Sequence, residues 1–217
     1  MSAPPELPDV VSRAFDVSRK HGYVSFCRNE TGRLLATLAA TRTGTLAEFG
    51  TGTGVGTAWL RSGIRADARI LTAELDATLA EAAGEIFAGD DQVEVLSADW
   101  STMRDRGPFS LLFLDAREPK NAGADTIIDL VEPGGVVVLD DFTPCSSWPP
   151  VYEGRVDTLR EQWLTDDRFV PAVGLPKRTK RRRVRRATPA ASSYQYALGA
   201  NTACTAATSV ASAVAAL

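Results

Sequence analysis

The sequence predicts an α/β protein with a doubly wound, mostly parallel central sheet. Between Thr45 and Val173, short runs of apolar and β-branched residues alternate with segments of helical periodicity, the pattern of repeated βαβ units. Several runs are apolar at consecutive positions, as strands covered on both faces must be. One run leads through four glycines, Gly50 to Gly56, into a helical segment. That strand–turn–helix unit is typical of ligand-binding α/β sheets.

The predicted elements follow one another in a regular order. Strands are expected at the apolar runs Thr45–Phe49, Arg69–Glu74, Gln92–Leu96, Ser110–Leu114 and Gly135–Asp140. Helices are expected after them, at Val55–Ser62, Asp76–Ala88, Ala122–Val131 and Tyr152–Thr165. Upstream, amphipathic patterns over Asp9–Lys20 and Thr31–Thr41 predict two helices that pack outside the sheet.

The chain divides into three parts on this pattern. Residues 1–44 are the N-terminal helices that pack on the domain, and residues 45–175 are the core. Residues 176–217 form an atypical tail, first basic and then rich in Ala, Ser and Thr, whose low complexity is typical of disorder.

Composition excludes several classes of protein. The chain has 217 residues, 44% of them hydrophobic and 24% charged, which is typical of a globular domain and not of a collagen-like or disordered chain. No long apolar run and no basic-apolar leader is present, so we expect neither a membrane span nor a secretory signal. The three cysteines are dispersed and odd in number, which favours reduced thiols in the cytoplasm.

The net charge of −3 hides an asymmetry between the two ends of the chain. Residues 1–176 hold 16 basic and 27 acidic residues, a net charge of −11, whereas Lys177–Arg186 holds 8 basic residues and no acid. Three interpretations of this tail stay open: a phosphate-binding arm, a solvated tail without a role, or out-of-frame translation. Aromatic interleaving is absent, so a nucleic-acid partner is not expected, although the basic run does not exclude one.

The stretch from Glu48 to Gly56 carries the most information about function. Glycine allows sharp backbone turns and close approach of a ligand, and the helix that follows presents free N–H groups. The dinucleotide pattern G-x-G-x-x-G fails in both registers, because positions 55 and 57 are Val55 and Thr57. The P-loop pattern fails because no Lys follows the glycines. The remaining form is E-x-G-x-G-x-G, with an acid inside the strand.

This form resembles the first motif of the class I S-adenosylmethionine-dependent methyltransferases, which have a Rossmann-like sheet. The resemblance implies cofactor binding by the motif: Glu48, Gly50, Thr51, Gly52, Thr53 and Gly54. The alternative for Glu48 is that it is only a buried acid satisfied by backbone N–H groups. A tight turn without any ligand is the other alternative for the glycines.

Two further matches follow the next two strands. Glu74 ends the second strand, where the family places the carboxylate that takes both ribose hydroxyls. Asp76 is expected to cap the helix that follows. After the third strand, the resemblance implies that Asp99 lies near the adenine amine, while the Ala98 N–H and Trp100 edge or stack on the ring.

The resemblance extends to the O-methyltransferase branch that includes the catechol O-methyltransferase-like enzymes, over about residues 30–173. It rests on the segment Glu30–Leu35 before the first strand and on acids that end the fourth and fifth strands. In metal-dependent members, the matching positions hold Mg²⁺, which here implies Asp115, Asp140 and Asp141 as ligands. Oxygen ligands suit Mg²⁺. The alternative is that Asp115 contacts the cofactor or substrate and Asp140 is a structural acceptor.

The sequence departs from that branch at the catalytic lysine. Its catechol enzymes carry Lys three residues after the first metal Asp, whereas this chain has Glu118 there. The nearest amines are Arg117 and Lys120, which makes Lys120 the candidate catalytic residue beside Asp115 and Asp140. Against this, the segment Pro119–Asn121 is typical of a solvated loop.

The implied reaction is in-line transfer of the methyl group of S-adenosylmethionine to a small, phenolic acceptor. The proline-rich Asp141–Pro150 connection is a candidate acceptor lid with Phe142 and Trp148 as walls, or else a packed surface loop. The alternatives are an RNA- or protein-directed methyltransferase and a catalytically silent cofactor-binding module. A homodimer is expected from the resemblance alone.

The resemblance also implies a final β-hairpin whose last strand enters the sheet antiparallel. Its first strand is expected at Arg168–Val173. For its second strand, Ser193–Leu198 is the only later candidate that we identify.

Overall fold

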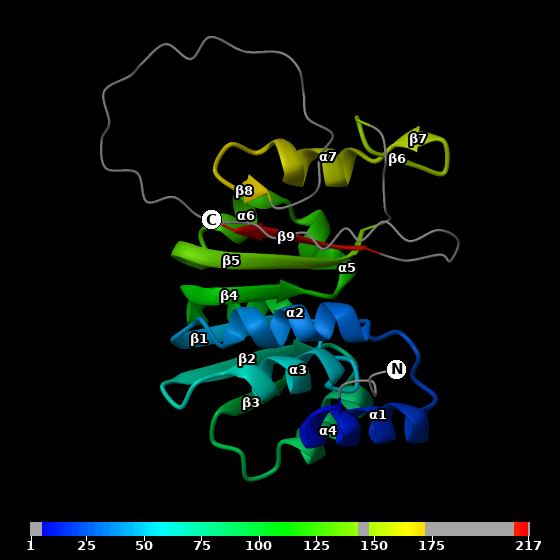
Figure 1. The fold of residues 1–217 in the computed structure, drawn as a ribbon, viewed down its shortest axis with the longest axis vertical. Coiled ribbons are helices and arrows are strands. Elements are labelled where there is room, and N and C mark those ends of the chain that lie inside the picture. Colours follow the sequence, from blue (N-terminus) through cyan, green and yellow to red (C-terminus); the bar gives the residue numbers. More distant parts are fainter. Residues whose placement is uncertain (1–5, 143–147, 172–210, 217) are drawn as a thin grey trace.

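The computed structural model describes residues 6–142 and 148–171, and the backbone of residues 211–216. One sheet contains the strands β1 (Gly44–Phe49), β2 (Ala68–Glu74), β3 (Val93–Ser97), β4 (Phe109–Leu114), β5 (Val131–Phe142), β8 (Val170–Pro171) and β9 (Ala211–Ala216). Their order is β3-β2-β1-β4-β5-β9-β8, which Figure 1 shows from β3 at the bottom to β8 near the top.

The first five strands of the sheet are parallel. β1 pairs with both β2 and β4, β2 with β3, and β4 with β5, whereas β9 is antiparallel to β5 and β8. The chain winds outward from β1 to β3 and then returns to β4 on the other side of β1. The carboxyl ends of β1 and β4 therefore border the topological switch point, where open α/β sheets bind ligands.

Helices flank this sheet. They are α1 (Asp9–His21), α2 (Asn29–Ala39), α3 (Val55–Gly63), α4 (Ala77–Ile86), α5 (Arg117–Asn121), α6 (Ala124–Ile128), α7 (Thr158–Thr165) and the 3₁₀ helix η1 (Trp100–Arg106). α3 contacts α1 and α2, and α1 also contacts α4. The predicted α/β architecture with two N-terminal helices is thus confirmed. Among the described residues, no helix has the length and apolarity to cross a membrane.

Two glycines allow α2 and α3 to approach closely. A Cβ atom at Gly32 would lie 2.2 Å from the Nε1 atom of Trp59, and one at Gly63 would lie 2.0 Å from the carbonyl oxygen of Ala36. At Gly32 the Trp59 ring of α3 fills the place of a side chain, and at Gly63 the helix packs directly on the backbone of Ala36. This contact fixes the N-terminal helices against the element that follows the glycine turn.

The core lies on the central strands, as their apolar runs predict. Every residue of β4 is buried, and the last four residues of β1 are buried as well. Burying a single Leu or Phe side chain contributes about 1.5–3 kcal/mol. The strands beneath the switch point are therefore a rigid base for the loops at their carboxyl ends.

Two predicted helices are wrong in extent. The Ala122–Val131 prediction corresponds only to α6, because Gly123 has a φ of 82° and separates α6 from α5, and Val131 already belongs to β5. The Tyr152–Thr165 prediction covers α7 only in its second half. Its first half belongs to a hairpin of β6 (Val151–Tyr152) and β7 (Arg155–Val156) that turns at Glu153 and Gly154, both with positive φ.

The last strand of the sheet lies elsewhere than predicted. The first strand of the expected hairpin is confirmed by β8, within Arg168–Val173. The second is β9 and not Ser193–Leu198, since β9 inserts antiparallel between β5 and β8. The range Ser193–Leu198 and the basic run Lys177–Arg186 lie outside the described residues.

Candidate functional site

The glycine turn follows β1 directly and is shaped by left-handed backbone. Gly50, Gly52 and Gly54 have φ values of 101°, 52° and 84°, which side-chain-bearing residues rarely adopt. A Cβ atom at Gly50 would also lie 2.8 Å from the backbone nitrogen of Ala116. The turn thus packs directly on the residues that follow β4. α3 begins at Val55, immediately after it.

Hydroxyl groups hold the turn in place from beneath. Thr51 Oγ1 lies 2.5 Å from Thr72 Oγ1, and Thr72 donates to Glu48 Oε2 at 2.9 Å. Because the Thr72 proton points at Glu48, Thr51 must donate to Thr72. The hydroxyl of Thr57 donates to the same Glu48 oxygen. The Thr51 side chain is therefore turned into the protein and away from the cavity.

Glu48 is the centre of this network and is fully buried. Loss of solvation raises its pKa to about 8, despite the hydrogen bonds from Thr57 and Thr72 that lower it. Its Oε1 atom has no hydrogen-bond partner and packs where a Cβ at Gly56 would lie, 2.1 Å away. Glu48 does not line the cavity described below. Its hydrogen bonds come from the hydroxyls of Thr57 and Thr72 and from the backbone of Thr57.

Glu74 lies at the tip of β2 and holds the outer side of the turn. Its Oε2 atom accepts from the backbone N–H of Gly52 at 2.8 Å, and its Oε1 atom accepts from the N–H of Asp76 at 3.0 Å. Each oxygen keeps a second lone pair for a ligand hydroxyl. The Asp76 side chain accepts from Thr78 and Leu79, which confirms the predicted cap of α4.

The residues after β3 form the next rim of the site. Asp99 is exposed and caps η1 by accepting from the N–H of Ser101, a bond that lowers its pKa. The Ala98 N–H donates to the carbonyl of Glu74 at 2.9 Å. Trp100 packs on Phe49 with ring centroids 5.4 Å apart. An adenine contact by Asp99, Ala98 or Trp100 stays a prediction.

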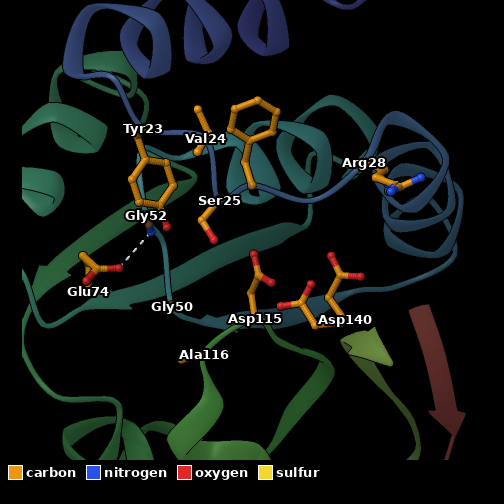
Figure 2. Close-up of a pocket in the computed structure, with 12 residues that line it drawn as sticks. Tyr23, Val24, Ser25, Arg28, Gly50, Gly52, Glu74, Asp115, Ala116 and Asp140 are labelled. Carbon is orange, nitrogen blue, oxygen red and sulfur yellow. Dashed lines mark hydrogen bonds between the residues drawn. The ribbon is translucent and has the colours of Figure 1, made fainter. Parts of the chain in front are cut away.

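A cavity of about 390 Å³ opens above the turn. Figure 2 shows Gly50, Gly52, Glu74, Asp115 and Asp140 around it. Asp141 lines it as well, so six predicted site residues come together. The cavity is closed on its far side by the connection between α1 and α2, in which Tyr23, Val24, Ser25, Phe26 and Arg28 line it. Sequence reasoning missed this connection. The sequence feature that could have indicated it is a pair of aromatic residues, Tyr23 and Phe26, in a segment without helical periodicity.

Two acids lie side by side at the ends of the central strands. Leu114 and Leu139 are register partners in β4 and β5, so Asp115 and Asp140, which follow them, are adjacent. Loss of solvation and the nearby charges of Asp140 and Glu48 raise the pKa of Asp115 well above its usual range. Asp140 is buried. The acids expected to converge beside the turn therefore do so.

A second cavity, of about 460 Å³, adjoins the first and shares three residues with it, Asp115, Asp140 and Asp141. Its other lining side chains include Lys120, the predicted wall Phe142, and Tyr152 and Leu159 from the segment around α7. Trp148, the other predicted wall, is half-buried but does not line this cavity. Residues 143–147 of the predicted acceptor lid lie outside the described residues.

Lys120 is buried and not the solvated loop residue that Pro119–Asn121 predicts. It lies in α5, its Nζ atom is 3.6 Å from Asp141 Oδ2, and its carbonyl accepts from Trp163 Nε1 at 3.2 Å. The hydrogen bond from Trp163 of α7 thus fixes the backbone of Lys120. By contrast Glu118, at the position where catechol enzymes carry lysine, is exposed.

The three predicted metal ligands, Asp115, Asp140 and Asp141, are not arranged as a metal centre in this structure. Across residues 6–142 and 148–171, no group of three or more His, Cys, Asp or Glu side chains is arranged to hold a metal ion. The Asp141 carboxylate is 69% exposed and faces the Lys120 ammonium group. Binding of Mg²⁺ by Asp115, Asp140 and Asp141 therefore stays a prediction, and the chemistry below uses the chain's own groups.

Comparison with known proteins agrees with this geometry. The family model of a methyltransferase domain matches residues 47–142, which run from β1 through the glycine turn to the end of β5. Comparison with the curated protein sequences gives no match.

Solved structures share the fold. A cofactor-bound structure of Rv0187 from MTB is 26% identical, with a TM-score of 0.56, over 62% of this chain and 66% of that one. An O-methyltransferase from Bacillus cereus in complex with SAH is 17% identical, with a TM-score of 0.68, over 98% and 92%. The O-methyltransferase TomG from Streptomyces achromogenes, in complex with SAM, is 19% identical, with a TM-score of 0.67, over 98% and 91%. Residues 47–142 are therefore a methyltransferase domain, and the fold of the chain is that of S-adenosylmethionine-dependent O-methyltransferases.

Proposed function

We propose that the protein transfers the methyl group of S-adenosylmethionine to a hydroxyl oxygen of a small aromatic molecule. The observation that carries this proposal is the junction of two cavities, of about 390 and 460 Å³, at Asp115, Asp140 and Asp141. One cavity adjoins the glycine turn and the other contains the buried Lys120. A donor and an acceptor in the two cavities would therefore meet beside the acids.

The first cavity suits the cofactor. Glu74 is held by Gly52 and Asp76 and presents its remaining lone pairs toward the cavity, where the two ribose hydroxyls can donate to them. The left-handed glycines let the ligand approach the backbone of the turn. In this arrangement Asp99 and Trp100 would face the adenine, and Asp115 would face the ammonium group of the cofactor.

The second cavity suits a phenolic acceptor. Phe142, Tyr152 and Leu159 give it apolar and aromatic walls, while Lys120 places a cation beside Asp141. The lysine ammonium can stabilise the acceptor as its phenolate, whose proton leaves to solvent. The oxygen then attacks the methyl carbon in line. The carbon–sulfur bond breaks with its electrons left on sulfur, so the products are a methyl ether and neutral S-adenosylhomocysteine.

The named complexes support this assignment. The Bacillus cereus structure holds SAH, and TomG holds SAM and is involved in tomaymycin synthesis. A small-molecule acceptor is therefore our proposal for this chain as well. We further propose a homodimer, which light scattering would test, and a cytoplasmic location, which the buried thiol of Cys27 supports.

The test is a transfer assay with S-adenosylmethionine labelled in its methyl group. The acceptor panel contains catechols, single phenols, RNA and unfolded protein, each with Mg²⁺ and with a chelator. Labelled ether from a phenol is the expected product. Tight cofactor binding with no labelled product would favour a silent binding module, and label in RNA or protein would replace the small-molecule proposal. Activity that disappears with the chelator and in Asp140→Asn would establish the metal prediction.

A further inference from the structure

Tyr23 lies directly on the glycine turn. A Cβ atom at Gly52 would lie 2.8 Å from the Tyr23 hydroxyl oxygen and 2.9 and 3.0 Å from the ring carbons Cε1 and Cζ. The aromatic ring therefore occupies the place where a side chain at position 52 would stand, as Figure 2 shows. Glycine is needed here for a contact within the protein as well as for its φ of 52°.

Ser18 of α1 joins this tyrosine to the turn. Its hydroxyl lies 2.6 Å from Thr53 Oγ1 and donates to the carbonyl of Ala14, so Thr53 is the donor to Ser18. The carbonyl of Ser18 accepts from the N–H of Tyr23 at 2.9 Å. Gly22, with a φ of 62°, ends the helix between them. A single buried residue thus fixes both the turn and the backbone from which the ring projects.

Tyr23 and Glu74 both contact Gly52, as Figure 2 shows. Glu74 contacts Gly52 through its backbone N–H, while Tyr23 contacts the same residue at its Cα side. Burial, together with the charges of Asp115, Glu74, Glu48 and Asp141, raises the pKa of Tyr23 to about 12, so its hydroxyl stays neutral among these acids. A neutral aromatic wall beside acids leaves the acids free to bind the ligand.

We propose that Tyr23 is a cofactor-binding residue that closes the cavity over the ligand against Gly52, and that Ser18 is its positioning residue. This inference rests on the proposed function, because the ligand of the cavity is taken to be S-adenosylmethionine. A ring that covers a bound ligand slows its escape more than its entry. Changes at Tyr23 should therefore appear mainly in the dissociation rate.

The experiment measures binding and release of S-adenosylhomocysteine by the full-length protein with stopped-flow fluorescence. Tyr23→Ala should release the ligand at least about tenfold faster, with an association rate within about threefold of the wild type. Tyr23→Phe should match the wild type because it keeps the ring. His21→Ala is the matched control, since His21 is an exposed neighbour that lines no described cavity. Unchanged release from Tyr23→Ala would overturn the proposal.

A double-mutant cycle tests the contact itself. Gly52→Ala should weaken ligand binding, and Tyr23→Ala should relieve part of that loss because the ring no longer collides with the new methyl group. Gly54→Ala, whose Cβ would meet Phe87, Ala83 and Ile86 instead, should combine additively with Tyr23→Ala. Additivity in both pairs would overturn the proposed contact.

The role of Ser18 has its own measurement. Ser18→Ala should speed ligand release in the wild type but should have no further effect in the Tyr23→Ala background. If Ser18→Ala speeds ligand release equally in the wild type and in Tyr23→Ala, the role of Ser18 is merely structural. That result would overturn its assignment as the positioning residue of Tyr23. If the wild type binds no S-adenosylhomocysteine while remaining folded by circular dichroism, the proposed function fails first. Binding by the wild type with no role for Tyr23 overturns only this inference.

Discussion

The Oε2 atom of Glu74 accepts a hydrogen bond of 2.8 Å from the backbone N–H of Gly52. The acid at the tip of β2 and the turn after β1 are thereby fixed to each other before any ligand binds. Asp76 holds the other carboxylate oxygen in the same way. The site is therefore preorganised for a ligand that touches both the turn and the acid, which lowers the entropic cost of binding.

Glu74→Ala should weaken binding of S-adenosylhomocysteine by about 1.5–3 kcal/mol, because it removes a charged acceptor of hydrogen bonds. Isothermal titration calorimetry measures this loss directly. Asp76→Asn is the matched control, because it keeps the helix cap and the backbone N–H that contacts Glu74. Wild-type affinity in Glu74→Ala would rule out the ribose contact.

Glu48 should make stability depend on pH. Its pKa is raised to about 8 in the folded protein, so the folded state holds the proton more tightly than the unfolded state does. Its contribution is then fully present below pH about 4.5 and is lost as pH rises through about 8, by a few kcal/mol in all. Glu48→Gln mimics the protonated form. Melting temperatures of the two proteins should agree at low pH, and above about pH 8 the variant should melt higher. Parallel curves over this range would refute the assignment.

Thr72 should be needed for the shape of the turn. Thr72→Val keeps the volume of a fully buried side chain but leaves Thr51 without its acceptor and Glu48 without one of its two hydroxyl donors. We expect a loss of about 1–3 kcal/mol in unfolding free energy and weaker cofactor binding. Chemical denaturation measures the first effect. Thr72→Ser retains the hydroxyl and should restore both; if it behaves like the valine variant, the hydroxyl is not what matters.

Lys120 should act on the acceptor and not on the cofactor. Lys120→Met keeps most of the apolar part of the buried side chain but removes the cation beside Asp141. Once an acceptor is known, kcat should fall about 10²-fold while the affinity for S-adenosylhomocysteine changes little. Steady-state kinetics and calorimetry give the two values. Unaltered turnover would remove Lys120 from the mechanism.

The sequence contains enough to predict the sheet and the cofactor side of the site. Runs of consecutive apolar residues mark strands buried on both faces, and the acids Glu74 and Asp115 directly follow such runs. Parallel strands end at one edge of a sheet, so strand ends alone bring these acids together. These features depend on local pattern and on a single rule of topology.

The acceptor side depends on contacts between distant segments. Lys120 is buried because Trp163 of α7 packs on α5, the helix that contains Lys120. The sequence around residue 120 has no pattern that predicts this contact. Tyr23 lies directly on Gly52, and Ser18 forms a hydrogen bond with Thr53, 35 residues further along the chain. β9 is an alanine-rich strand whose place is set by the free edge of β5. Local periodicity carries no information on such partners.

The cavity above the glycine turn is the site that we propose for S-adenosylmethionine. The most direct test is calorimetric titration of S-adenosylhomocysteine into the full-length protein and into Glu74→Ala. We expect saturable binding at one site per chain with about micromolar affinity, weakened at least about tenfold in the variant. A folded wild-type protein that takes up no S-adenosylhomocysteine would contradict it.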